Sequence, residues 1–349
     1  MKNKILTTFV QVFLLVIWIA IQAIAIASLA SVLTGIDYKI TLFLTAAVTI
    51  LYTSMGGLKI DILTDFVQFW IILITFLIMA VIGFNYVGGF SNLLANLPTG
   101  HLDPFAFGGV AWFLGAVLLS GWMYLGNTSH WQRIFSAKNQ ETAKKSFLLS
   151  IPFVLILSLI VVFLGLVASI KLSGINPDFA FFYLMTDMLP PVLVGVGFAS
   201  ILAVIMSSVD SLVIGGSTIL YKTFFKKHQF TNKKEIFFAR LITCLFGFGG
   251  FLLAFAVPKI ITLSLIVSYL ALIFVPPVLA GMYSKRISAD ASFYSILIPT
   301  ILLFLLYPIL DSNTFLVSSP LGILLILFYD RMFKKKRELT PLEMAGLEE

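Results

Sequence analysis

Long apolar runs separated by short polar stretches recur along almost the whole chain. A helix that crosses about 30 Å of hydrocarbon needs about 20 predominantly apolar residues. The pattern predicts ten membrane-spanning helices, at residues 5–34, 40–57, 66–87, 109–130, 147–170, 195–221, 236–257, 260–283, 291–310 and 314–330. The first run is too long for a secretory signal and lacks a small-residue cleavage site, so we expect it to remain as a span.

Composition supports an all-α integral membrane protein. Hydrophobic residues make up 60% of the 349 residues and charged residues only 11%, and the mean hydropathy is +1.05. These values lie far outside the range of water-soluble domains. Because Cys244 is the only cysteine, the sequence excludes a disulfide framework and a cysteine metal cluster.

The basic residues predict the orientation, because short cytoplasmic loops retain Lys and Arg. If the N-terminus is cytoplasmic, only Lys39, Lys171 and Lys259 of the 23 basic residues fall outside. We therefore expect a multi-pass protein of the cell (cytoplasmic or inner) membrane with both termini cytoplasmic. The formal net charge of +7 is explained by lipid headgroups at the ends of the spans, so no nucleic-acid partner is expected.

No segment outside the predicted spans is long enough to fold alone. The longest are residues 88–108 and 171–194, both expected outside. The sequence thus predicts a single transmembrane domain over residues 1–337 and a cytoplasmic tail at 338–349.

The fourth predicted span mixes glycines with polar and aromatic side chains. It contains Trp122, Tyr124 and Asn127 between Gly121 and Thr128. Broken helices of transporters expose backbone groups that can hold a substrate or an ion. Small residues that allow close helix packing are the alternative interpretation.

The sixth predicted span carries Ser207, Ser208, Asp210 and Ser211 in an otherwise apolar stretch. Polar groups at that depth are expensive and tend to face a cavity, and their oxygens suit an alkali cation. In the alternative interpretation the serines bond back to the preceding helical turn and a neighbouring helix satisfies Asp210.

Asp65 lies at the predicted cytoplasmic start of the third span. The positive end of a helix favours a carboxylate there in any protein, so we expect a capping role.

Common enzyme motifs are absent from the sequence. It contains no nucleotide-binding G-x-x-x-x-G-K-[ST] loop, no H-E-x-x-H and no G-x-S-x-G. Its three histidines, His101, His130 and His228, lie far apart. We therefore do not expect an enzyme.

Four segments together resemble the sodium:solute symporter family, the solute carrier family 5-like transporters. They are residues 51–68 (LYTSMGGL running on to TDFVQ), 132–144 (QRIFSAK with Ala143-Lys144), 203–211 and 280–286 (AGMYSKR). The resemblance implies the LeuT-like ten-helix inverted-repeat core and Na+-coupled symport of a small-molecule solute by alternating access.

The same resemblance implies a sodium site. The matching positions are the hydroxyls of Ser207 and Ser208 and the backbone carbonyl of Val204.

Further roles follow by resemblance for other residues. Asp65 matches an acidic residue implied in sodium release toward the cytoplasm, and we place Asp210 and Ser211 in the same release or gating group. Asn127 lies in the sixth core helix, which lines the substrate cavity, and Trp122 and Tyr124 are assigned to the same lining.

Matched to the family, the chain lacks counterparts of core helices one and two. Residues 1–87 correspond to core helices 3–5, 109–284 to core helices 6–10, and 285–337 to two accessory helices. We expect an N-terminally shortened symporter that transports poorly or not at all alone. The alternative is a non-transporting relic, or a fragment that needs a separately encoded N-terminal half.

Overall fold

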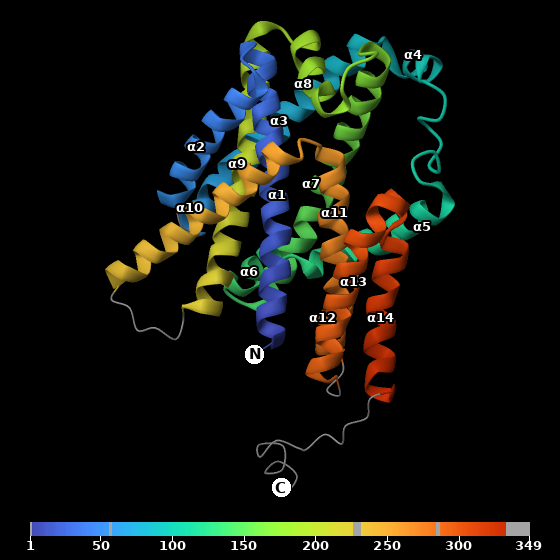
Figure 1. The fold of residues 1–349 in the computed structure, drawn as a ribbon. Helices are drawn as coiled ribbons and strands as arrows, with labels where there is room; N and C mark the ends of the chain where they lie inside the picture. Colours follow the sequence, from blue (N-terminus) through green and yellow to red (C-terminus); the bar gives the residue numbers. More distant parts are fainter. Residues whose placement is uncertain (1, 56–57, 226–231, 284–286, 333–349) are drawn as a thin grey trace, which may run out of the picture.

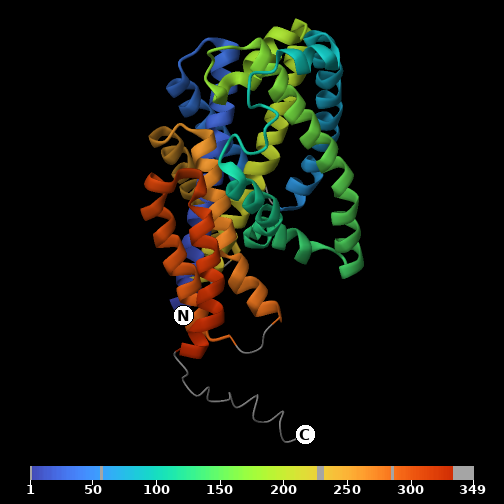
Figure 2. The same cartoon turned by 90° about the vertical axis from the view of Figure 1, so that its right-hand side faces the viewer.

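The computed structural model describes residues 2–55, 58–225, 232–283 and 287–332. This part of the chain is almost wholly helical and contains no strand (Figure 1 and, turned by 90°, Figure 2), which confirms the all-α prediction. The elements in chain order are α1 Lys2–Thr34, α2 Tyr38–Met55, α3 Leu58–Val87, α4 Gly89–Asn96, α5 Gly109–Leu119, η1 Ser120–Gly126, α6 Thr128–Ser136, α7 Gln140–Lys171, α8 Pro177–Met188, α9 Pro191–Phe224, α10 Asn232–Ala256, α11 Ile260–Ile273, α12 Val275–Tyr283, α13 Ala289–Leu310, η2 Asp311–Asn313 and α14 Phe315–Met332.

Some positions used in the sequence analysis lie outside the described residues. They are Gly56 and Gly57 of the first family segment, residues 226–231 with His228, residues 284–286 of the last family segment, and residues 333–349, which include the predicted tail at 338–349.

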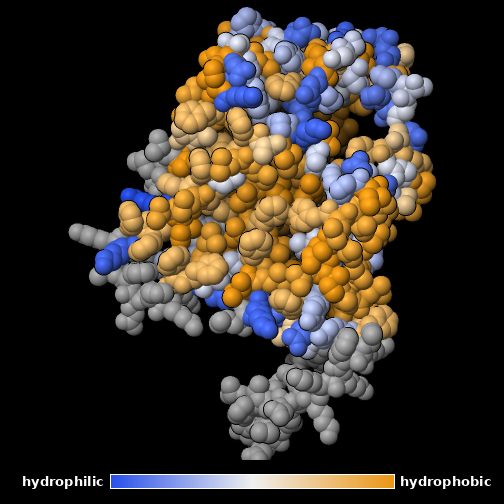
Figure 3. Space-filling model, in the orientation of Figure 1, coloured by the Kyte–Doolittle hydropathy of each residue, from blue (hydrophilic) through white to orange (hydrophobic). Residues whose placement is uncertain are grey.

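Seven helices of the described chain are long and apolar enough to cross a membrane: Lys2–Thr34, Ile62–Val87, Gly109–Gly126, Gln140–Lys171, Pro191–Phe224, Ile260–Tyr283 and Ala289–Asn313. Three shorter apolar helices, Tyr38–Val48, Arg240–Ala256 and Phe315–Tyr329, fall at the other three predicted spans. Hydrophobic residues cover the middle of the molecular face in Figure 3, and hydrophilic residues gather at its upper end. These are the helices of a multi-pass membrane protein.

Helix α1 is the centre of the helix bundle. It contacts α9, α10, α2 and α11 (Figure 1), and 61% of its most apolar window is buried, against 22% for α7. A helix that is apolar all round is expected to be surrounded by other helices or by lipid. Most of the surface of α1 is buried by the other helices of the bundle.

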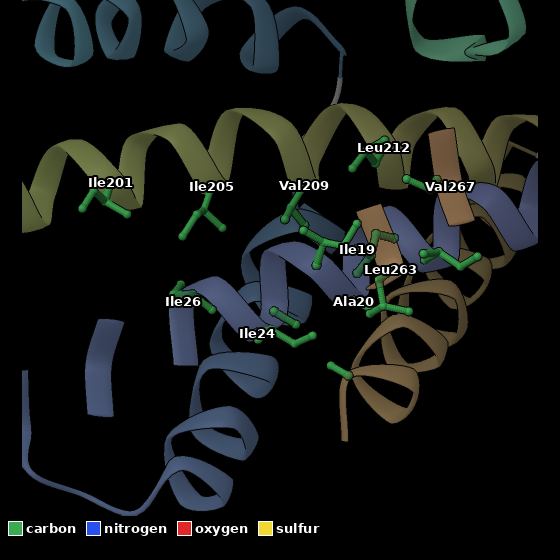
Figure 4. Packing of buried hydrophobic residues seen from close by; sticks show 14 of the residues in the cluster. Ile19, Ala20, Ile24, Ile26, Ile201, Ile205, Val209, Leu212, Leu263 and Val267 are labelled. Carbon is green, nitrogen blue, oxygen red and sulfur yellow. The ribbon is translucent and has the colours of Figure 1, made fainter. Parts of the chain in front are cut away.

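The packing between α1 and α9 follows the helical repeat. Ile201, Ile205, Val209 and Leu212 recur every three or four residues along α9 and lie toward α1 and α11 (Figure 4). Ile19 of α1 is among the fully buried residues on the opposing side. This seam fixes the part of α9 that carries the polar residues of the sixth predicted span.

Small residues allow close approach where α10 crosses this core. A Cβ built on Gly216 of α9 would lie 2.4 Å from the ring of Phe246. One built on Gly250 of α10 would lie 2.3 Å from Ile19 Cγ2. Glycines at such contacts bring helices together in membranes, where van der Waals packing is a main attraction.

The fourth predicted span is a broken helix. The α-helix α5 ends at Leu119, the 3₁₀ helix η1 follows, and Asn127 is extended (φ −100°, ψ 116°) before α6 begins. A 3₁₀ stretch inside a helix often marks a hinge or a site of strain. The broken-helix interpretation of this span is therefore confirmed.

The Gly216 contact yields a stability prediction. We expect Gly216→Ala to destabilise the protein by about 1–3 kcal/mol, because the added methyl group overpacks against the buried Phe246 ring. Gly195→Ala on the same helix is the matched control, since nothing in the described chain lies within 4 Å of its built Cβ. The measurement is thermal unfolding in detergent. Equal unfolding temperatures for both variants would contradict the tight contact.

Candidate functional site

A cavity of about 350 Å³ lies between α1, α3, the η1–α6 segment, α9 and α11. Its lining residues are Trp18, Gln22, Asp65, Met123, Tyr124, Asn127, His130, Arg133, Ser207, Ser208, Ser211, Leu212, Val267, Ser268 and Ala271. We call it the central cavity. Its size suits a small solute, and its lining combines an apolar wall with a few convergent polar groups, as ligand sites do.

The structure brings six of the nine site residues predicted from the sequence into this lining. They are Asp65, Tyr124, Asn127, Ser207, Ser208 and Ser211. The other three do not line the cavity. Val204 lies one helical turn before the serines, Asp210 is buried within the bundle, and Trp122 is half exposed beside the break.

An oxygen cluster lies where α9 meets the central cavity. The hydroxyls of Ser207 and Ser208 each donate to the Val204 carbonyl oxygen, both at 3.0 Å. This is the back-bonding that the sequence allowed as an alternative. It also gathers three oxygens, the two hydroxyls at the edge of the cavity and the Val204 carbonyl one turn away, and each hydroxyl keeps lone pairs that can accept a cation.

A chain of polar contacts joins three helices beside this cluster. Arg133 Nη2 of α6 donates to Asp65 Oδ2 of α3 at 2.9 Å and to Ser211 Oγ of α9 at 2.8 Å. Ser211 in turn donates to the Ser207 carbonyl at 3.1 Å. The ion pair is partly exposed, 43% for Arg133 and 23% for Asp65, so it adds at most about 1 kcal/mol of stability. Its importance lies in tying α3, α6 and α9 together.

The predicted capping role of Asp65 is wrong. Helix α3 begins at Leu58 rather than near residue 66, so Asp65 lies two turns inside the helix. Its Oδ2 accepts a hydrogen bond from Arg133 of α6.

Helix α1 contributes polar residues that the sequence analysis missed. Gln11 Nε2 donates to the Gly126 carbonyl at 2.6 Å, and Thr128 Oγ1 donates to Gln11 Oε1 at 2.9 Å. Trp18 and Gln22 line the central cavity. Since Gln11, Trp18 and Gln22 lie seven and four residues apart, they share one face of the helix. That spacing within an apolar run was the signal that could have found them.

The break in the fourth span is held by close contacts. A Cβ on Gly126 would lie 2.1 Å from the Ala271 carbonyl oxygen of α11, and Trp131 Nε1 donates to the Leu125 carbonyl at 2.8 Å. Gln11 satisfies the next carbonyl, that of Gly126. The unwound backbone is therefore tied to α1 and packed on α11, beside the cavity.

Comparison with known proteins identifies related transporters. The family model described as sodium:solute symporter family matches residues 2–299. The osmoregulated proline transporter OpuE of Bacillus subtilis is 31% identical over 220 residues, covering 59% of this chain and 44% of the relative. The high-affinity proline transporter PutP of the same organism is 26% identical over 306 residues, covering 82% and 64%. This chain thus spans less than two thirds of either relative.

A solved structure shares the fold. It is that of a Na+-coupled sialic acid symporter in a substrate-bound outward-open state, with a TM-score of 0.80 and 16% identity. The match covers 97% of this chain and 76% of that one. The likeness confirms the predicted transporter fold.

The Gly126 contact yields a prediction about the site. We expect Gly126→Ala to destabilise the protein by about 1–3 kcal/mol, because the methyl group would meet the backbone of α11 and push the break out of place. Gly121→Ala in the same 3₁₀ helix is the control, since its built Cβ meets nothing within 4 Å in the described chain. Thermal unfolding of the two variants checks the difference, and a larger loss for Gly121→Ala would overturn it.

Proposed function

We propose that this chain, which belongs to the sodium:solute symporter family, takes part in sodium-coupled symport of a small polar solute across a membrane. The observation that carries the proposal is the meeting of the α9 oxygen cluster, the broken helix and the Asp65–Arg133 pair at one cavity. The relatives OpuE and PutP are described as transporters, and no enzymatic step is proposed.

We assign sodium, the coupling ion, to the oxygen cluster of Ser207, Ser208 and Val204. Hydroxyls and exposed carbonyls are the oxygen ligands that transporters offer to Na+. The Val204 carbonyl already accepts two hydrogen bonds, so at least one serine hydroxyl has to rotate before this carbonyl can bind the ion. Sodium binding would therefore change the hydrogen bonding of α9 locally.

The contact chain through Arg133 supports a gating role for Asp65 and Ser211. Ser211 accepts a hydrogen bond from Arg133 and donates one to the Ser207 carbonyl. A movement of Ser207 on sodium binding would therefore alter the position of Arg133, which pairs with Asp65 and joins α6 to α3. Asp210 is buried next to Ser211, and we place it in the same group. Release of sodium would accompany separation of the Arg133 contacts, in keeping with alternating access.

We assign the solute to the part of the central cavity lined by Tyr124 and Asn127. The ring of Tyr124 lies beside that of His130, with ring centroids 4.8 Å apart and the planes tilted by 33°, and Asn127 lies in the unwound backbone. Trp122, half exposed, would join this lining once neighbouring helices enclose the break. The relatives named as proline transporters make L-proline the first probe.

In the core numbering of the family, we assign α1–α3 to core helices 3–5, α5–α12 to core helices 6–10, and α13 and α14 to accessory helices, all within one domain. The assignment leaves out core helices one and two.

In the described chain, α5 has no buried residue and α7 is largely exposed, with Leu149 at 68% and Leu159 at 61%. We propose that two further helices cover these surfaces, in a longer form of the polypeptide or from a separate N-terminal half.

The orientation is proposed from charge. Both described termini lie at the same end of the molecule (Figure 1), and twenty of the 23 basic residues fall on that side in the predicted topology. We propose a place in the cytoplasmic membrane with both termini in the cytoplasm.

The first test is sodium-dependent uptake of labelled L-proline, sugars and carboxylates into proteoliposomes. We compare this chain with a form extended at its N-terminus by the upstream reading frame. We expect uptake only by the extended form, and at least a tenfold loss when Ser207→Ala and Ser208→Ala are combined, because two sodium ligands are removed.

Ser217→Ala is the matched control for that experiment. Ser217 lies on the same helix and bonds back to Ile214 at 3.2 Å, but it does not line the central cavity. We expect uptake close to that of the unmodified protein. Equal loss in the control and the double variant would contradict the sodium assignment, and no uptake by either form would favour a non-transporting protein.

The orientation has its own test. A reporter that is active only in the cytoplasm should be active when it is fused after Lys2 or after residue 332. At Gly100, in the long connection between α4 and α5, that reporter should be inactive, and a reporter that is active only outside the cytoplasm should be active. Opposite results at either terminus would overturn the proposed topology.

A further inference from the structure

A second cavity, which we call the upper pocket, lies near the end of the molecule opposite the termini, where α8 and the α1–α2 connection are found (Figure 1). It measures about 230 Å³ and is lined by Ile24, Ser28, Tyr38, Lys39, Asn176, Asp178, Phe179, Phe255 and Pro258. It shares no lining residue with the central cavity. The roles proposed above do not use any of its residues.

Two hydroxyls of the upper pocket are buried without a hydrogen-bond partner in the described chain, Ser28 Oγ and Tyr38 OH. Ser28 is 0% exposed. Other helical serines, such as Ser207 and Ser208, bond back to their own helix, and Ser28 does not. A buried polar group left unpaired is unfavourable. Two such groups at one cavity indicate that something polar occupies it.

The upper pocket also contains two opposite charges that are held apart. Asp178 Oδ2 accepts from the Ile260 amide at 3.4 Å, at the start of α11, where the helix dipole favours an anion. Lys39 Nζ lies 5.8 Å from the centroid of the Phe255 ring. No ion pair joins Lys39 to Asp178 within the described residues. Each charge is therefore positioned by its own contacts and can still bind a ligand.

Apolar groups form the remaining wall. Phe179 meets Tyr38 edge to face, with ring centroids 6.4 Å apart, and Ile24, Phe255 and Pro258 complete the lining. A ligand that matches this lining carries one positive group, one negative group and a compact apolar part. Ligand pockets combine an apolar wall with a few placed polar groups in this way.

We propose that the upper pocket binds a small zwitterion of the α-amino-acid class at a site separate from the central cavity. The ammonium group lies against Asp178 and the carboxylate against Lys39. The hydroxyls of Ser28 and Tyr38 bond to the carboxylate, and the side chain packs among the aromatic rings. Binding here needs neither sodium nor the α9 oxygen cluster.

The test is equilibrium binding of tritiated L-valine to the purified full chain in lipid nanodiscs, in choline buffer without sodium. We expect saturable binding that unlabelled L-valine displaces. Isovalerate lacks the ammonium group and isobutylamine lacks the carboxylate, and each should compete at least tenfold more weakly. Competition by either compound equal to that of valine would overturn the zwitterion assignment.

Variants locate the binding. Asp178→Asn and Lys39→Gln should each weaken it at least tenfold. Asp187→Asn, on the same helix α8 but outside the pocket, should leave it unchanged. The Ser207→Ala, Ser208→Ala double variant should also leave it unchanged, so failure of the sodium assignment and failure of the upper pocket give different results.

A labelling experiment covers the case in which a charge variant fails to fold. Ser28→Cys in a Cys244→Ser background places one thiol in the upper pocket. We expect a small thiol reagent to label it and L-valine to slow that labelling at least fivefold, with isovalerate ineffective. Labelling that L-valine does not slow, together with no sodium-free binding, would show a water-filled crevice and overturn the proposal.

Discussion

The structure depends on one constraint, which is that backbone polar groups within a bilayer need partners inside the protein. A helix that breaks between residues 120 and 127 frees such groups at the level of the central cavity. The side chain of Gln11 donates a hydrogen bond to the Gly126 carbonyl, and the indole of Trp131 donates one to the Leu125 carbonyl. The break can exist only because other parts of the chain supply these donors.

This requirement explains why α1 lies in the middle of the bundle. Its apolar surface packs on α9, α10, α2 and α11, while one polar face reaches the break and the cavity. The same helix thus contacts both the segment assigned to the solute and the helix assigned to sodium. A displacement of α9 against α1 would shift the contacts that α1 makes with the broken helix. This gives a physical route by which binding of one ligand changes the affinity for the other.

The sequence predicted the fold well, because an apolar run of about 20 residues has few alternatives to a membrane helix. It also predicted the broken fourth span, and it predicted that Ser207 and Ser208 face a cavity, because polar groups are costly in lipid. It failed on Asp65, since the helix begins well before the apolar run that marked its start. It missed Gln11 because a single amide in an apolar run does not reveal which distant carbonyl it meets.

The burial of α1 has a consequence for biogenesis. As the first described helix, α1 leaves the ribosome long before α9, α10 and α11, which later surround it. Until those helices are inserted, Gln11 and Gln22 lie in an apolar segment without their final neighbours, where polar side chains are unfavourable. Helix α1 is therefore made early but reaches its native environment late, and assembly of the core waits for the second half of the chain.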